Sequence, residues 1–378
     1  MKRLFFTLAC LTVLICATAF LQERELTVEQ LREIYSGEMT KWPKPDLDAE
    51  AKPGFKDIGY LGRPVYPKEN PYSSEKEKLG KILFFDPRMS VSRQIACASC
   101  HDPELGWGDG KRVAYGHDRL SGKRNAMTIL NTAFYKELFW DGRASSLEHQ
   151  AVFPIQDHLE MNMDLTVMVK NIREIAGYKE FFNKAFGSDE VTLDKIQKAI
   201  ATFERGIVST NSKFDAFVKG NKAALKDDEV MGLHLFRTKA RCINCHNSPL
   251  FSDNKFHNDG QALQGTRFED LGKYNQTKKL SDIGSFRTPS LRETAISGPW
   301  MHHGNFPSLM DVIEFYNLGN PVVLQKALEA KVPDSMRTPK SPMLKKLNLS
   351  LVERQQLEAF LKSISTRVNK INPPILPK

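Results

Sequence analysis

The chain has 378 residues, more than a single hydrophobic core usually organises, so the sequence predicts two domains. The formal net charge is +9, but lysine and arginine are scattered along the chain, which argues against a nucleic-acid partner. The six cysteines do not form a disulfide framework. Cys10 and Cys16 fall in an N-terminal leader, and the other four belong to two motifs described below.

The first residues have the pattern of an export signal. Lys2 and Arg3 precede an apolar run over residues 4–20, which contains the small-residue cleavage pattern Ala17-Thr18-Ala19. We therefore expect residues 1–19 to be a cleavable signal peptide and the mature protein to be periplasmic. Because the apolar run is fairly long, an uncleaved membrane anchor is the alternative. No later segment is apolar enough to span a bilayer.

Residues 20–75 are rich in charged residues and proline, and they predict an extension that wraps or tethers the first domain. One short helix is expected in this extension, over residues 27–35. From Ser74 the pattern becomes helical and leads towards the first cysteine motif. The apolar side chains of this predicted helix are Leu79, Ile82, Leu83 and Phe85.

Two cysteine motifs dominate the sequence, one in each half. They are Cys97-Ala98-Ser99-Cys100-His101 and Cys242-Ile243-Asn244-Cys245-His246. Two thiols one helical turn apart can add to the vinyl groups of a haem while the following histidine ligates the iron, so each motif predicts one covalently attached c-type haem. A zinc knuckle and a thioredoxin-like pair are the alternatives, but neither explains a histidine directly behind both thiol pairs.

A weak internal repeat accompanies these motifs, since Gly80–Phe84 precedes the first much as Gly232–Phe236 precedes the second. Two further stripes of apolar residues at helical spacing predict core helices. They are Leu193, Ile196, Ile200, Phe203 and Ile207, and Leu357, Phe360, Leu361 and Ile364. Strand signals are scarce, and residues 251–272 and 277–288 predict long loops around the second haem.

Together these patterns predict a mainly α protein with two cytochrome c-like domains, each with one covalently attached c-type haem. We place the first haem domain at residues 76–222 and the second at residues 223–366. The join lies near residues 210–228, and residues 367–378 form a proline-rich tail.

Several stretches of the sequence resemble the bacterial di-haem cytochrome c peroxidase and MauG superfamily. They are Gly122–Asn131, Phe139–Ala151, Pro154 with Glu160-Met161, Thr288–Arg292 and Pro299–Gly304. The resemblance covers residues 76–366 and leaves the extension unexplained. It implies a peroxidatic haem in the first domain and an electron-transfer haem in the second, which suits peroxide reduction because that reaction takes two electrons and iron supplies them singly.

The resemblance implies roles for residues around the first haem. His101 is the proximal iron ligand, Gln150 and Glu160 line the distal side, and Pro154 packs beside them. Cleavage of an O–O bond needs a group that moves a proton from the near oxygen to the leaving one, and a carboxylate in an apolar pocket can do so. Glu160 is therefore the expected general acid/base. A surface glutamate at a loop end is the alternative.

Two further matches concern the region between the domains. Trp140 corresponds to the tryptophan that the family places between the two haems, although composition alone favours an ordinary core tryptophan. Asn125, with the backbone carbonyls of Ser297 and Pro299, falls on the family's calcium site. Ligation by oxygen atoms alone suits a hard cation such as Ca²⁺.

Two positions distinguish the branches of the superfamily. His117 matches the histidine that closes the peroxidatic haem in resting peroxidases and moves away on activation. At the second haem, whose proximal ligand should be His246, Tyr316 stands where peroxidases carry a distal methionine, and this feature is MauG-like. A thioether favours ferrous iron, whereas a phenolate stabilises ferric or higher-valent iron. Met301 and Met310 are nearby alternatives to Tyr316 as ligands.

The first hypothesis is a periplasmic di-haem peroxidase that reduces hydrogen peroxide to water with electrons from a small donor protein, a cytochrome c or a cupredoxin. The second is a MauG-like oxidase that modifies residues of a partner protein through high-valent haem. The third is a non-catalytic electron carrier in which His117 permanently fills the peroxidatic site. Two covalently bound haem c groups and one Ca²⁺ are the expected cofactors, and a homodimer is left open.

Overall fold

The computed structural model describes residues 26–209, 211–319, 331–366 and 371–378. Within these ranges the chain is mainly helical, as the sequence predicts, with one two-stranded antiparallel sheet. Its strands β1 (Phe256–Asn258) and β2 (Ser285–Arg287) lie in the two predicted loop regions, with Phe256 opposite Arg287. No helix in these ranges is long and apolar enough to cross a membrane. The predicted signal peptide, residues 1–19, lies outside the described residues.

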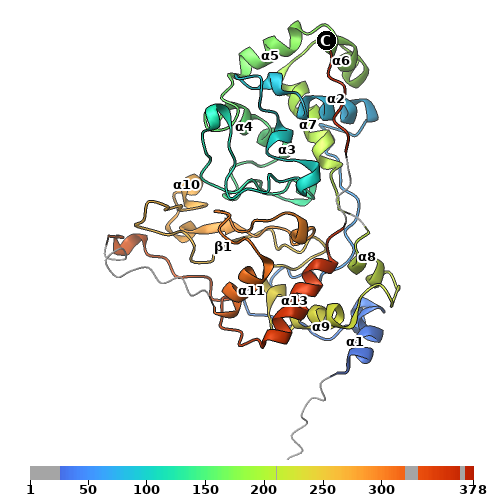
Figure 1. Cartoon of the computed structure of the whole chain (residues 1–378), viewed down its shortest axis with the longest axis vertical. Coiled ribbons are helices and arrows are strands. Elements are labelled where there is room, and N and C mark those ends of the chain that lie inside the picture. Colours follow the sequence, from blue (N-terminus) through green and yellow to red (C-terminus); the bar gives the residue numbers. More distant parts are fainter. Residues whose placement is uncertain (1–25, 210, 320–330, 367–370) are drawn as a thin grey trace, which may run out of the picture.

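The helices of the first half gather in the upper part of Figure 1. They are α2 (Ser74–Phe84), α3 (Leu147–Gln150), α4 (Val152–Gln156), α5 (Leu165–Glu174), α6 (Tyr178–Phe186) and α7 (Leu193–Arg205). Their core contains the predicted apolar face of α7, with Ile196, Ile200 and Phe203 all buried. Ser73 begins α2 by accepting a hydrogen bond from the Lys76 backbone N–H, which satisfies one of the free donors of the first turn.

The second half gathers in the lower part of Figure 1 around a separate core. Its helices are α1 (Val28–Tyr35), α8 (Lys213–Val218), α9 (Asp227–Arg237), α10 (Tyr274–Thr277), α11 (Leu309–Asn317) and α13 (Leu351–Ser363). The predicted closing helix corresponds to α13, and the four side chains of its predicted apolar stripe are all buried. The strands and α10 belong to the second half but lie between its other helices and those of the first half (Figure 1).

The same helix pairing occurs in both halves. In the first half α2 packs on α7 so closely that a Cβ atom at Gly80 would lie 1.9 Å from the backbone oxygen of Ala199. In the second half α9 packs on α13, and a Cβ atom at Gly232 would lie 2.0 Å from the backbone oxygen of Gln356. Only glycine permits this approach. The structure thus supports the predicted internal repeat.

Equivalent phenylalanine side chains pack between the helices of both pairs. Phe84 on α2 and Phe203 on α7 have ring centroids 5.3 Å apart, and so do Phe236 on α9 and Phe360 on α13. Both pairs have the edge-on arrangement that aromatic rings favour. Each haem motif therefore follows a helix that is fixed to its core by the same glycine and phenylalanine contacts.

The first part of the N-terminal extension packs on the second half, whereas Asn70 near its end donates to Glu148 and to the Lys198 carbonyl of the first half. Of the two predicted arrangements, the extension therefore tethers the first half but does not wrap it. Leu31 and Tyr35 on α1 are buried in the second core, together with Ile58. Buried Arg237 on α9 forms an ion pair with Asp57 and donates to the carbonyl of Pro43 at 2.7 Å. The physical reason is that Arg237 of α9 finds its ion-pair and hydrogen-bond partners in the extension, at Asp57, Tyr35 and Pro43. The expected short helix is confirmed as α1, for which Thr27 is the N-cap.

The C-terminal residues follow the second half in sequence but pack on the first half. Figure 1 shows the C-terminus beside α5 and α6. Ile371 and Leu376 pack against the first core. The backbone N–H of Gly177 donates to the carbonyl of Lys378 at 2.8 Å, and Arg88 donates to the carbonyl of Pro377 at 2.9 Å. The first and the last described segments therefore each pack on the half that is distant in sequence.

Candidate functional site

The first cysteine motif opens into a large cavity. A 3₁₀ turn, Cys97–Ser99, presents Cys97 and Cys100 to a cavity of about 1010 Å³, and His101 also lines it. The Nδ1 atom of His101 donates to the Trp107 carbonyl at 3.1 Å, which leaves Nε2 as the nitrogen free to bind a metal. Burial lowers the pKa of His101, so the imidazole is neutral, as an iron ligand must be.

The second motif has the same local geometry. A 3₁₀ turn, Cys242–Asn244, precedes Cys245 and His246, and Nδ1 of His246 donates to the Phe251 carbonyl at 3.1 Å. Burial again lowers the histidine pKa. The extension supports this turn directly, because the Asp48 backbone N–H donates to the Asn244 side-chain oxygen at 2.7 Å.

The first cavity fits a haem in size and in chemistry. Its volume lies at the upper limit of the roughly 300–1,000 Å³ that cofactor pockets usually have. Two thiols and a neutral imidazole lie at one part of its wall, which supplies both covalent attachment and one iron ligand. Aliphatic side chains line other parts of it, and they are Ile95, Ile129, Leu147, Met161 and Ile200.

The four predicted catalytic residues all line this same cavity: Trp140, Gln150, Pro154 and Glu160. They come from different elements, since Gln150 ends α3, Pro154 lies in α4, and Glu160 follows in a loop. Burial, with a contribution from Asp157, raises the pKa of Glu160 to about 7, although nearby Arg143 lowers it. A carboxyl group with this pKa can both accept and return a proton at neutral pH.

Trp140 lies where the two halves meet. Its indole N–H donates to the Asn125 carbonyl at 3.1 Å, and its ring lies edge-on to His302 of the second half, with centroids 6.4 Å apart. The His302 ring in turn stacks on Phe286 of β2 with centroids 3.6 Å apart. A continuous aromatic contact therefore joins the first cavity to the second half.

His117 lies on a loop that packs against the backbone of Glu160. Its backbone N–H donates to the Glu160 carbonyl at 2.7 Å. Its side chain contacts Asp118, with Nε2 3.2 Å from the carboxylate, and its buried Nδ1 has no hydrogen-bond partner among the described residues. The described residues that line the cavity do not include His117. Iron ligation by His117 stays a prediction.

Tyr316, on α11, lies close to the second motif. Burial raises its pKa well above the ordinary value, and Asp259, Cys245 and Cys242 raise it further. The side chain of Asp259 accepts from Gln261 at 2.6 Å, and Gln261 contacts His303 at 2.7 Å. His303 lines the first cavity, so a chain of polar groups connects the surroundings of Tyr316 with that cavity.

The predicted calcium ligands lie on two neighbouring segments. The backbone N–H of Asn125 donates to the His302 carbonyl at 2.8 Å, which brings Asn125 beside the segment that contains Ser297 and Pro299. The Asn125 side-chain amide donates to the Lys111 carbonyl at 2.9 Å. Its oxygen is the atom left for a cation, and calcium binding stays a prediction.

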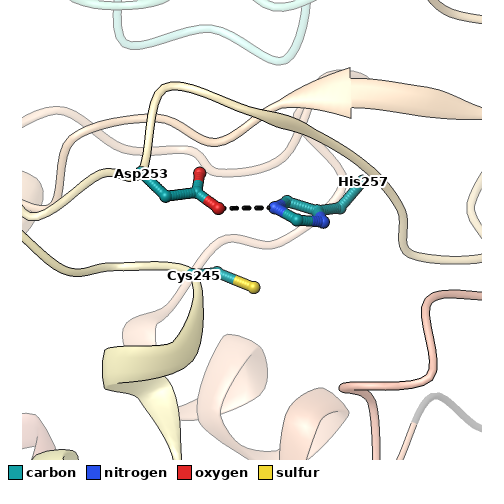
Figure 2. A group of neighbouring side chains, drawn as sticks. All are labelled: Cys245, Asp253 and His257. Carbon is teal, nitrogen blue, oxygen red and sulfur yellow. Dashed lines mark hydrogen bonds and ion pairs between the residues drawn. The ribbon is translucent and has the colours of Figure 1, made fainter. Parts of the chain in front are cut away.

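A cluster beside the second motif has the ligand types of a metal site (Figure 2). Ligand atoms of Cys245, Asp253 and His257 lie within 4.8 Å of one another, and His257 Nε2 is 2.8 Å from the Asp253 carboxylate. Burial lowers the pKa of His257, but Asp253 and Cys245 outweigh it and raise the pKa to about 10. Attachment of a haem to Cys245 leaves only two ligands, so we assign the cluster to the surroundings of the second haem.

Sequence reasoning missed several residues of the first cavity. No role for His302 itself followed from the sequence, whereas the structure places it in the cavity wall. Arg287, Asp270 and Gln276 line the same cavity from the second half. Glu204 on α7 also lines it, and burial raises its pKa to about 8. No periodicity or spacing in the sequence signals that these distant segments meet, because tertiary packing alone brings them together.

The chain has two haem attachment motifs, each on the same kind of helix pair, and carboxyl groups line the cavity at the first motif. These features define a di-haem c-type oxidoreductase. A sequence profile of the di-haem cytochrome c peroxidase family matches residues 74–223. A cytochrome-c peroxidase, IdrP1, of Pseudomonas sp. (strain SCT) is 38% identical over 328 residues, covering 79% of this chain and 83% of the relative. The chain belongs to the di-haem cytochrome c peroxidase and MauG family.

Relatives of both branches resemble this chain. The methylamine utilization protein MauG of Methylophilus methylotrophus is 37% identical, covering 82% of this chain and 89% of the relative. Among solved structures, a MauG-like protein associated with microbial copper homeostasis has a TM-score of 0.73 at 30% identity, covering 81% of this chain and 93% of that one. Membership of the family implies two haem c groups.

Proposed function

We propose that this protein is a periplasmic di-haem peroxidase that reduces hydrogen peroxide to water with electrons from a small donor protein, a cytochrome c or a cupredoxin. The observation that carries this proposal is the position of Glu160. Its carboxyl group lines the same cavity as the first cysteine motif, together with Gln150 and Pro154. Burial gives Glu160 a pKa of about 7, which suits proton transfer at neutral pH.

The haem and the residues of the cavity have different roles in the reaction. A bound haem supplies the iron that binds peroxide and passes single electrons. Glu160 accepts the proton of one peroxide oxygen and returns it to the other oxygen as the bond between them breaks. Gln150 can donate to one oxygen and accept from the other without a change of charge. Each turnover consumes one peroxide, two protons and two electrons, and it releases two waters.

We further propose that residues 76–222 and 223–366 are two cytochrome c-like domains, each with one covalently attached haem. His101 and His246 are their proximal iron ligands. The repeated helix pairs support this division, because the first helix of each pair precedes a cysteine motif whose histidine donates to a backbone carbonyl at 3.1 Å. We also propose a calcium ion at Asn125, Ser297 and Pro299, which stiffens the boundary between the domains.

Rapid mixing of the purified holoprotein with hydrogen peroxide tests the peroxidase proposal. We expect a prompt change of the Soret band, followed by return of the starting spectrum when a reduced donor protein is present. A Soret band that stays unchanged in both the oxidised and the half-reduced protein would rule the proposal out. Intact-mass measurement of the exported protein checks export in the same sample, because loss of residues 1–19 and a gain of two haem masses are expected.

A MauG-like oxidation of a partner protein is the second candidate. Tyr316 favours it, because a phenolate at the second iron stabilises the oxidised states in which oxidising charge is shared. Trp140, whose ring lies edge-on to His302, offers a contact through which that charge can pass. The variant Tyr316→Phe separates the candidates: a changed spectrum of the second haem supports the oxidase, and an unaltered spectrum removes its main support.

A further inference from the structure

Glu204 on α7 is a buried acid that takes no part in the proton transfer assigned to Glu160. It is 5% exposed and lines the first cavity. Among the described residues, none donates a hydrogen bond to its carboxyl group or forms an ion pair with it. An unpaired carboxylate is costly in a protein interior, and proteins keep such a group mainly where it has a function.

The charged groups that act on Glu204 oppose each other. They are Arg205, the next residue of α7, and Glu148 on α3, which packs against α7. These two side chains form an ion pair with each other at 2.6 Å, so neither is a counter-ion for Glu204.

Two aspartates in the cavity wall show the contrast. Asp141 and Asp270 both form ion pairs with Arg124 at 2.7 Å. They therefore have a fixed cation that keeps them ionised. Glu204 has none, so its charge depends on what occupies the cavity.

The repeated helix pair shows what packing alone requires at this position. Phe203 on α7 and Phe360 on α13 hold equivalent places in the two pairs, and the next residues are Glu204 and Leu361. Leu361 is buried in the core of the second half. The same scaffold therefore accepts an apolar side chain here, and the carboxyl group is a feature of the first half alone.

We propose that Glu204 takes up a proton when the haem attached at Cys97 and Cys100 is reduced, and releases it when that haem is oxidised. The added electron makes the buried cavity more negative, and a proton on the unpaired carboxylate cancels that charge. Iron passes from ferric to ferrous while the carboxylate becomes a carboxylic acid, so one electron and one proton from solvent enter together. The proposal rests on haem attachment at the first motif, and it holds whether the enzyme is a peroxidase or a MauG-like oxidase.

The ionisation of Glu204 supports this role. Burial raises its pKa to about 8, although Arg205 lowers it. Glu204 has a lower pKa beside ferric iron than beside ferrous iron, because ferric iron carries one more positive charge. Between those two values only the ferrous state holds the proton. A fall in pH through this interval therefore favours reduction of the first haem.

Spectroelectrochemical titration of the holoprotein at a series of pH values tests the proposal with the variants E204Q and E204L. In the wild type we expect the ferrous-to-ferric ratio of the first haem, at a fixed solution potential, to fall by up to tenfold for each pH unit, or about 59 mV in the midpoint. Both variants should lose most of this dependence. The second haem, in the half that carries Leu361, should keep its wild-type behaviour and serves as the internal control.

Infrared difference spectra between the reduced and the oxidised holoprotein identify the group that is protonated. We expect reduction to produce the carbonyl band of a protonated carboxyl group, and E204Q to abolish that band. Glu160 also lines the cavity, and burial raises its pKa to about 7. E160Q is therefore the comparison, and it should retain the band.

The outcomes separate the possible proton acceptors. A midpoint of the first haem that does not change with pH overturns the proposal. A dependence that survives in both Glu204 variants assigns the proton to a haem propionate, and one lost only in E160Q assigns it to Glu160; either result overturns the proposal. If E204Q does not accumulate, E204L replaces it, because the second half packs leucine at the equivalent position. A pH dependence that only the Glu204 variants lose supports the proposal even in a protein that fails to react with peroxide, and intact mass with two haems confirms attachment.

Discussion

The two cysteine motifs are held by the same kind of helix pair, but different side chains surround them. Each motif follows a helix held by a glycine against a second helix, and each motif histidine donates to a carbonyl at 3.1 Å. The first motif opens into a cavity of about 1010 Å³ with the carboxyl group of Glu160 in its wall. The second has Tyr316, a buried side chain whose pKa burial raises well above its ordinary value. The helix pair and the cysteine motif, which both halves have, provide for cofactor attachment. Glu160 in one half and Tyr316 in the other give the two sites their different chemistry.

Removal of the Glu160 carboxyl group should have the largest effect, on the rate of reaction with peroxide. We expect Glu160→Gln to slow the reaction with peroxide by about 10²–10⁴-fold, the usual contribution of a general acid/base, while both haems stay attached. Stopped-flow rate constants measure the effect. Glu104→Gln, at an exposed glutamate of the same half, should react at the rate of the unchanged protein. Equal rates in the two variants would remove Glu160 from the mechanism.

The pH dependence of the same rate constant is the next largest effect. Glu160 has to be a carboxylate to accept the first proton, and burial raises its pKa to about 7. The rate constant should therefore fall about tenfold for each pH unit below that pKa and level off above it. The Glu160→Gln variant should lose this inflection. A wild-type profile that is flat through neutral pH would contradict the assigned role.

Substitution of the two helix-contact glycines tests how alike the scaffolds are. Gly80→Ala and Gly232→Ala each place a methyl group about 2 Å from a backbone oxygen, so each should lower the free energy of unfolding by about 1–3 kcal/mol. Denaturant midpoints of the holoprotein measure this loss. Gly62→Ala, where no atom lies within 4 Å of the added carbon, should be neutral. Strong destabilisation by only one of the two would show that the halves are not packed alike.

The smallest expected effect concerns the support of the second motif by the extension. Asn244 is buried and its side chain donates to the Asp46 carbonyl at 2.9 Å, in addition to its contact with Asp48. The side chain of Ser99, at the equivalent place in the first motif, bonds among the described residues only to Ala96 of its own turn. Asn244→Ala should therefore lower the free energy of unfolding by about 1–3 kcal/mol, and Ser99→Ala by about 1 kcal/mol. Equal losses, measured as denaturant midpoints, would mean that the extension contributes nothing to this motif.

The sequence revealed the parts of the site whose chemistry is local. The two motifs, the short helix over residues 28–35 and the core stripes of α7 and α13 follow from spacing and periodicity. The resemblance pointed to Gln150 and Glu160, which the structure brings to one cavity. The periodicity of apolar residues is enough to predict which face of a helix is buried, and the motif spacing is enough to predict the attachment sites.

Other parts of the site depend on contacts between distant segments and could not be predicted. Arg287 and His302 reach the first cavity from the second half, and no local pattern signals that approach. The extension was expected to wrap or tether the first domain, yet most of it packs on the second half, where Asp57 pairs with Arg237. A segment rich in proline and charge carries little information about which surface it will cover, because the surface itself supplies the apolar and charged partners.

Electron paramagnetic resonance of the fully oxidised and the half-reduced holoprotein, each with and without a small iron ligand, tests the central claim most directly. The claim is that only the haem at Cys97 and Cys100 opens a coordination position to an oxidant. The account predicts a high-spin signal in at least one of the two redox states, converted to low-spin by one equivalent of added ligand, while the other haem is unaffected. Two low-spin signals that persist in both states and ignore the ligand would contradict it and would favour a protein that only carries electrons.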